Sequence, residues 1–344
     1  MGRRSPLSLL LVCALGCSSS SGADPKQAAA PTAPTAPTAL PDCATCTVLA
    51  TDVGEVRSVA ADATNLYVLA AAFGADTTAP FTLRRFDRDG KSLVIDDQVP
   101  RSTRPEPIVA DDGIAFYATN SAIVRVGRDG SRSSFFAVIG CHSLAIADGF
   151  LYFGGYRGTT PTLQRCPLAG CSQPEAVTDT YFYAEAMRVG SGAVLFTEVG
   201  VAPFKVSVLD LASKETVQST TTHPSALAIA AGTAFWVDTA GLLNTCALPR
   251  CSGSARLAGA PDVTAFMVKD NDLYVARGDG LFRHPVDPNC QANGCSETVA
   301  LTAGFAKDGE YASAIDFVAA DAAYLYFVAP AAKGKPGVIA RRPR

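Results

Sequence analysis

The sequence predicts an all-β fold assembled from a repeated unit of about 43 residues. Short apolar runs rich in aromatic and β-branched residues recur along the chain, and Gly, Asp, Pro and Ser bound them, which is typical of strands. The two clearest copies begin at Leu144 and Leu227, with the sequences LAIADGFLYF and LAIAAGTAFW. A period of roughly 40 to 45 residues is that of a four-stranded propeller blade. We therefore expect a seven-bladed β-propeller with four-stranded blades, and six or eight blades are the alternatives.

One aromatic residue or leucine marks the same position in each copy of the repeat. These positions are Tyr67, Phe116, Tyr152, Leu195, Phe235, Tyr274 and Tyr326. Each copy is expected to supply four strands, of which the first is small and apolar, as in 143–147 and 226–230, and the second carries the aromatic residue, as in 233–237. We expect the first strand to be innermost, because bulky side chains would clash where blades converge on a narrow axis.

The two ends of the repeat region complement each other. The last copy stops after its third strand, near 337–341, and residues 46–51 resemble an outer strand such as 295–301. The N-terminal segment is therefore expected to complete the last blade and close the ring, which removes exposed sheet edges.

The repeat resembles bacterial propeller repeats of the form Ile-Ala-Val-Asp followed by Val-Tyr-Trp. It is more distantly similar to YWTD-type and TolB-like repeats, and residues 151–153 and 123–130 are the nearest matches. The resemblance covers most of residues 46–344 and implies a propeller fold and an extracytoplasmic location. It implies no chemistry, because propellers host many unrelated functions.

The first residues predict export. Arg3 and Arg4 precede an apolar run from 7 to 15, which has the length of a signal-peptide core and is too short to span a bilayer. The following Ala14-Leu15-Gly16-Cys17 resembles a bacterial lipobox, which implies cleavage before Cys17 and its acylation. An ordinary secretory signal that contains a cysteine is the alternative.

The export signal and the repeats together divide the chain. Residues 1–16 are expected to be the signal peptide, residues 17–42 the lipidated cysteine and a disordered Ser/Pro/Thr/Ala tether, and residues 43–344 the propeller. The whole chain resembles a bacterial lipoprotein of the myxobacterial type. The resemblance implies lipid anchoring at the cell envelope, in the bacterial outer membrane, with exposure to the periplasm or the cell surface.

The chain contains 11 cysteines, and three pairs of them share one spacing. Cys166/Cys171, Cys246/Cys251 and Cys290/Cys295 align with the hairpin turns at 86–91 and 126–131, so a disulfide across each hairpin is expected in an oxidising compartment. Zinc is the alternative, but these pairs belong to different blades and zinc needs converging ligands. Cys43/Cys46 is a closer pair, also predicted to be a disulfide, although so short a ring is strained. Cys141 is left unpaired, either as a buried core thiol or as a reactive thiol beside His142.

A candidate ligand face lies in loops that propellers use for binding. His142 and His223 precede two first strands at equivalent positions. Further basic, acidic and aromatic side chains fall in two other such loops, and the candidate set is His142, His223, Tyr181, Tyr183, Glu185, Arg101 and Arg104. The alternative is that these are ordinary solvated loops.

The remaining sequence argues against most catalytic classes. It has no Gly-x-Ser-x-Gly, His-Glu-x-x-His or phosphate-loop motif, and its net charge of −3 argues against nucleic-acid binding. We expect a monomeric, non-enzymatic binding or scaffold lipoprotein without metal or cofactor, whose partner is an envelope protein, a peptide or a glycan. The alternative is a propeller enzyme, a lyase or hydrolase with its site at the axis. A third option is a redox or metal role of Cys141 and His142.

Overall fold

The computed structural model describes most of the chain between residues 39 and 344. The described ranges are 39–40, 43–101, 108–119, 121–157, 160–178, 184–198, 205–219, 226–238, 240–251, 255–256, 262–270, 272–277, 280–286, 299–302, 315–331 and 334–344. They belong to one compact unit, Pro37–Arg344. Within these ranges every regular element is a strand, as predicted.

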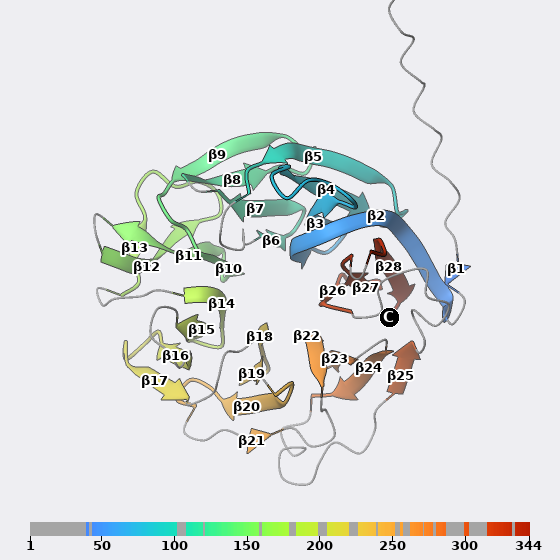
Figure 1. Ribbon diagram of the computed structural model, residues 1–344. Coiled ribbons are helices and arrows are strands. Elements are labelled where there is room, and N and C mark those ends of the chain that lie inside the picture. The colour runs from blue at the N-terminus through green and yellow to red at the C-terminus, as the bar shows by residue number, and fades with distance from the viewer. Residues whose placement is uncertain are drawn as a thin grey trace, which may run out of the picture. The chain divides into compact units, whose positions relative to one another are not determined.

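Five sheets of four antiparallel strands follow one another along the chain, and each sheet has its strands in sequence order (Figure 1). The first two are β6 (Ile108–Asp111), β7 (Ile114–Ala118), β8 (Ala122–Val126), β9 (Arg132–Ala137), and β10 (Ser143–Ala147), β11 (Phe150–Arg157), β12 (Thr160–Pro167), β13 (Glu175–Ala176). The other three are β14 (Ala184–Gly190), β15 (Ala193–Glu198), β16 (Val206–Asp210), β17 (Thr216–Ser219); β18 (Ala226–Ala230), β19 (Thr233–Val237), β20 (Leu243–Ala247), β21 (Ala255–Arg256); and β22 (Val263–Lys269), β23 (Asp272–Arg277), β24 (Gly280–Pro285), β25 (Val299–Thr302).

The sixth sheet has eight strands and joins the two ends of this unit. Its order is β26 (Phe317–Ala320), β27 (Tyr324–Ala329), β28 (Gly337–Pro343), β2 (Cys43–Ala61), β3 (Asn65–Ala72), β4 (Phe81–Asp87) and β5 (Ser92–Val99), and β1 (Ala39–Leu40) pairs with β2. Ala39–Leu40 was expected in the tether, and the structure pairs it with the fold.

The long strand β2 belongs to two groups of strands. Thr47, Val48 and Ala50 pair with β28, as the sequence predicts for residues 46–51. The later half of β2 pairs with β3, and Val53 pairs with both Gly337 and Ala72. One continuous strand is therefore the outer strand of the last group and the first strand of the next.

The first strands of successive groups contact one another in a closed cycle. In order, the cycle is β2, β6, β10, β14, β18, β22, β26 and again β2. Figure 1 places these strands at the centre and the fourth strands, such as β9 and β17, at the rim.

The core consists of layers between neighbouring sheets. The cluster of Tyr67, Leu69 and Phe81 from one sheet with Ile108 and Tyr117 from the next is one example. The described core residues fall into seven such clusters, each between consecutive groups of strands. Burial of aliphatic and aromatic side chains between the strand groups supplies the hydrophobic stabilisation.

Candidate functional site: the axial cavity

A cavity of about 310 Å³ lies where the seven first strands converge. All seven strands of the cycle contribute lining residues, so the cavity occupies the axis of the ring. The residues at the same register position in six of these strands are Ala60, Val109, Ala145, Ala228, Met267 and Ala319. Small side chains dominate because seven strands approach one axis.

The seventh strand places an arginine at this position. Arg188 of β14 pairs with Leu195, as Ala228 pairs with Phe235 in the next sheet. It is the one charged side chain among the described residues that line the cavity. A long cation therefore replaces the alanine, valine or methionine of the other first strands.

Arg188 lies among converging strands but is exposed. Its side chain faces the open space of the axial cavity, and the surrounding strands desolvate the guanidinium only in part. This desolvation lowers the pKa of the Arg188 guanidinium, and no described carboxylate lies within ion-pair distance of it. Its Nη1 donates to the carbonyl of Met187 at 2.8 Å. The guanidinium has five N–H donors, so most of its donor capacity remains for a ligand or water.

Backbone groups add polarity to the cavity. Each first strand pairs with a second strand on one side only, and its other edge faces the axis (Figure 1). An unpaired strand edge presents alternating N–H and C=O groups. The cavity therefore combines small apolar side chains, backbone dipoles and one cation, which suits binding of a small polar or anionic molecule.

The predicted ligand face is described at two of its residues. Arg101 donates from Nε to the Ala79 carbonyl at 2.5 Å, forms an ion pair with Glu55 at 2.5 Å, and lies over the Phe81 ring at 4.4 Å. These contacts give Arg101 a structural role.

His142 packs edge-on against a tyrosine. Its ring centroid lies 6.2 Å from that of Tyr156. His223, Tyr181, Tyr183, Arg104 and the side chain of Glu185 lie outside the described part of the structure, so a ligand face built from them remains a prediction.

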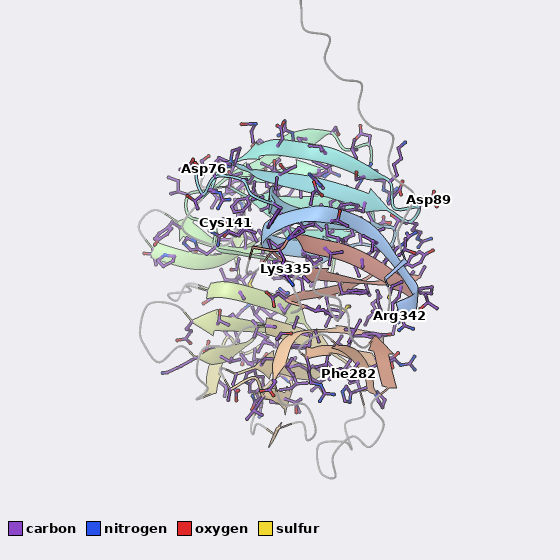
Figure 2. All side chains as sticks on the ribbon, turned by 45° about the vertical axis from the view of Figure 1, so that its right-hand side comes forward. Asp76, Asp89, Cys141, Phe282, Lys335 and Arg342 are labelled. Atoms are coloured by element: carbon purple, nitrogen blue, oxygen red, sulfur yellow. A yellow bond between two sulfur atoms is a disulfide. The ribbon has the colours of Figure 1, made fainter. Side chains whose placement is uncertain are left out.

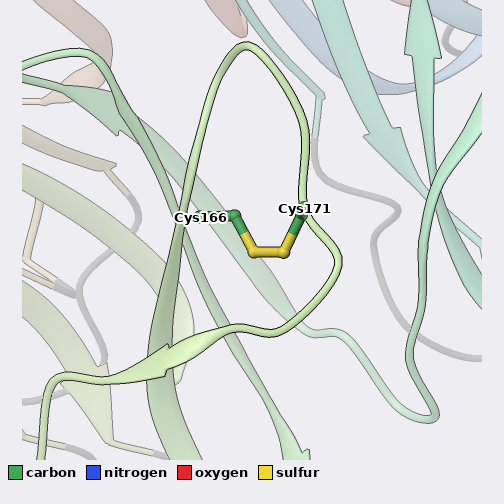
Figure 3. The surroundings of a disulfide bond; sticks show 2 residues. All are labelled: Cys166 and Cys171. Carbon is green, nitrogen blue, oxygen red and sulfur yellow. A yellow bond between two sulfur atoms is a disulfide. The ribbon is translucent and has the colours of Figure 1, made fainter.

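Two of the predicted hairpin disulfides are present. Cys166–Cys171 (Figure 3) and Cys246–Cys251 have Cα–Cα distances of 5.4 and 5.0 Å and close the turns after β12 and β20. Cys290 and Cys295 lie outside the described residues, and their bridge stays a prediction.

The other cysteines behave differently. Cys46 is disulfide-bonded, whereas the side chain of its predicted partner Cys43 is outside the described set. Cys141 (Figure 2) is buried in a core cluster with Cys166, and burial raises the pKa of its thiol to about 12. A thiol so rarely ionised is a poor nucleophile, which favours the core interpretation over the reactive one.

The described residues offer neither a metal-binding cluster nor a membrane-spanning helix. They contain no group of three or more His, Cys, Asp or Glu side chains arranged to hold a metal ion. None of the described elements is a helix long and apolar enough to cross a bilayer.

The fold resembles that of several solved proteins. The structure of streptogramin B lyase matches with a TM-score of 0.57 and 11% identity over 86% of this chain and 95% of that one. A gluconolactonase from Xanthomonas campestris matches with a TM-score of 0.51 and 14% identity over 92% of this chain and 99% of that one. A computationally designed protein matches with a TM-score of 0.51 and 14% identity over 82% and 83%.

The chain has a β-propeller fold. Identities this low establish the fold alone. No family model matches the sequence, and a search of curated proteins finds no match.

Arg188 was not identified as a site residue from the sequence, although the spacing of the repeat could have identified it. The lining residue on each first strand lies seven positions before the marker of its copy, as with Ala145 and Tyr152 or Arg188 and Leu195. Applying that interval to all seven markers would have found the single charge at this register position of the first strands.

Proposed function

We propose that this chain is a lipid-anchored, seven-bladed propeller of the cell envelope that binds a ligand without converting it. The observation that carries the proposal is the axial cavity, whose described lining side chains are aliphatic, aromatic or Met apart from Arg188. Such a lining can bind and orient a molecule, but a general acid–base pair or a nucleophile with its base needs other residue types. The blade count is supported by the cycle of seven first strands and by the seven core clusters.

The enzyme alternative draws support from the fold neighbours. Two of them are streptogramin B lyase and a gluconolactonase. The test is native mass spectrometry of the protein extracted from its host, followed by re-addition of whatever small molecule it releases. Recovery of that molecule unchanged after prolonged incubation is expected. Stoichiometric or catalytic conversion to a product would favour the enzyme and overturn the binding proposal.

The anchor is supported by the lipobox-like residues that precede and include Cys17. Substitution of Cys17 by Ser should abolish labelling by a fatty-acid analogue and shift the protein from the membrane fraction to the aqueous one. A matched substitution, Cys13→Ser, lies within the apolar run and should leave both unchanged. Full membrane retention of the Cys17→Ser protein would contradict the anchor.

A further inference from the structure

We propose that the axial cavity is a binding site for a small organic monoanion, a carboxylate with a short apolar body, and that Arg188 binds its charged end. The inference deepens the proposed binding function and rests on it. It names the ligand class of the cavity, the residue that determines that class and the stoichiometry of one ligand per chain.

The unpaired charge of Arg188 favours an anionic ligand. Arg188 lines the cavity without a carboxylate partner among the described residues, so its charge is uncompensated while the cavity is empty. An anion that enters the cavity provides that partner. Guanidinium and carboxylate match in a planar, bidentate geometry, and such charge-assisted hydrogen bonds are about twice as strong as neutral ones.

The charges of the cavity lining favour a monoanion. The described lining has one cation and no carboxylate, so a monoanion leaves the site neutral. A dianion would leave one negative charge uncompensated beside apolar side chains, which is unfavourable. A cation would meet Arg188 and be repelled.

The apolar lining and the volume of the cavity favour a ligand with a small apolar body. The rest of the lining is apolar and includes Val189 of the same strand and Ala228 and Ile229 of the next first strand. A ligand with an aliphatic or small aromatic body would bury apolar surface against this lining and gain about 25 cal/mol per Å². The volume of about 310 Å³ is at the small end of ligand pockets. The ligand is therefore a small acid and not a peptide or a glycan.

Arg188 can be replaced by a side chain that another first strand carries at the same register position. Met267 is its counterpart on β22, so Arg188→Met introduces a side chain that this ring already contains. The variant should melt at the same temperature as the wild type or higher, because the charge that it removes has no ion-pair partner among the described residues. Arg128→Met is the matched control, because Arg128 is exposed and pairs with Asp112 on the outside of the sheets.

The experiment is calorimetric titration and thermal shift of the full exported protein with sodium acetate, butyrate and hexanoate at constant ionic strength. Wild type and Arg128→Met should bind butyrate or hexanoate saturably at one site, with a melting temperature that rises with ligand concentration. Arg188→Met should bind at least tenfold more weakly and show no such rise. Butylamine and succinate should bind at least tenfold more weakly than butyrate to the wild type.

Four results would overturn the inference. They are the absence of saturable carboxylate binding to the wild type, equal affinity in Arg188→Met, tighter binding of succinate than of butyrate, and binding of butylamine equal to that of butyrate. None of these touches the broader proposal, which fails only if the natural ligand released from the protein is chemically converted. The two failures are therefore separable.

Discussion

At the residue scale, buried carboxylates accept hydrogen bonds from tyrosine hydroxyls. The Tyr326 hydroxyl donates to Asp321 at 2.8 Å, and Asp321 also accepts from the backbone N–H groups of Ala323 and Tyr324. Asp321 is fully buried, so these donors replace the water that its carboxylate loses on folding. The pair is structural, and it shows that a buried acid in this fold need not indicate a functional site.

A second such carboxylate makes stability depend on pH. Burial alone would raise the pKa of Asp96, but hydrogen bonds from the Tyr117 hydroxyl at 2.7 Å and the Gln98 backbone N–H, with the ion pair to Arg132, outweigh it and lower the pKa below 3.8. A depressed pKa in the folded state stabilises the fold above the unfolded-state value. That stabilisation is lost as the pH falls through the folded-state value.

Substitution of Asp96 by Asn should therefore destabilise the protein in a pH-dependent way. At neutral pH the free energy of unfolding should fall by about 1–3 kcal/mol. The gap to the wild type should narrow as the pH falls below about 3.8, where the carboxyl of the unfolded chain becomes protonated, and should close below the lower pKa of the folded state. Urea unfolding across this pH range measures the gap. Asp97→Asn, at an exposed neighbouring position, serves as the control and should change little. A gap independent of pH would show that the charge of Asp96 contributes nothing.

At the element scale, tight turns keep the repeat in register. The first and second strands of four sheets are joined by two-residue turns in which both φ angles are positive, as at Asp148 and Gly149, with φ of 51° and 77°. Such turns match the twist of paired strands and favour Asp-Gly or similar dipeptides. In these four sheets, the turns fix the number of residues between the side chain that lines the cavity and the marker residue of the second strand. The placement of Arg188 in the cavity thus follows from the turn at Ser191 and Gly192.

Gly54 marks the point where β2 changes partners. A Cβ added there would lie 2.5 Å from the Ala72 carbonyl oxygen and 2.8 Å from that of Ala71. Both atoms are backbone, so β2 and β3 would have to separate. Gly54→Ala should lower the free energy of unfolding by about 1–3 kcal/mol, as overpacking does. Gly170→Ala, which meets no atom within 4 Å, is the matched control and should be nearly neutral. Equal melting temperatures of the two variants would contradict this account of the seam.

At the scale of the whole molecule, closure of the ring depends on a short stretch of β2. Thr47, Val48 and Ala50 supply three of the four residues that pair with β28, and Val48 is buried in the core cluster that includes β26, β27 and β28. Loss of this stretch leaves β28 as an open edge and removes the link between the two ends of the unit. An unpaired edge strand is also a site of aggregation.

Two truncations of the exported chain test ring closure. Deletion of 18–38 ends before β1 and should change the melting temperature little. Deletion of 18–51 removes β1 and three of the four residues that pair with β28, and should cause a large drop in melting temperature together with aggregation. Equal melting temperatures would mean that this part of β2 does not hold the ring closed.

The sequence alone determined the strand-rich repeat, its period, several strand bounds and the pairing of residues 46–51 with the last strand group. These features depend on local information, because alternation of apolar residues, turn dipeptides and marker spacing act within one copy. Tertiary structure decided that β2 is one continuous strand serving two groups. It also decided that Arg188 lines an axial cavity, because only convergence of seven first strands makes one register position a shared site. Within one copy of the repeat, a charged residue at that position cannot be distinguished from an ordinary surface residue. It becomes a candidate ligand-binding residue once the structure shows that the side chains at the same position of the other six strands are small or apolar.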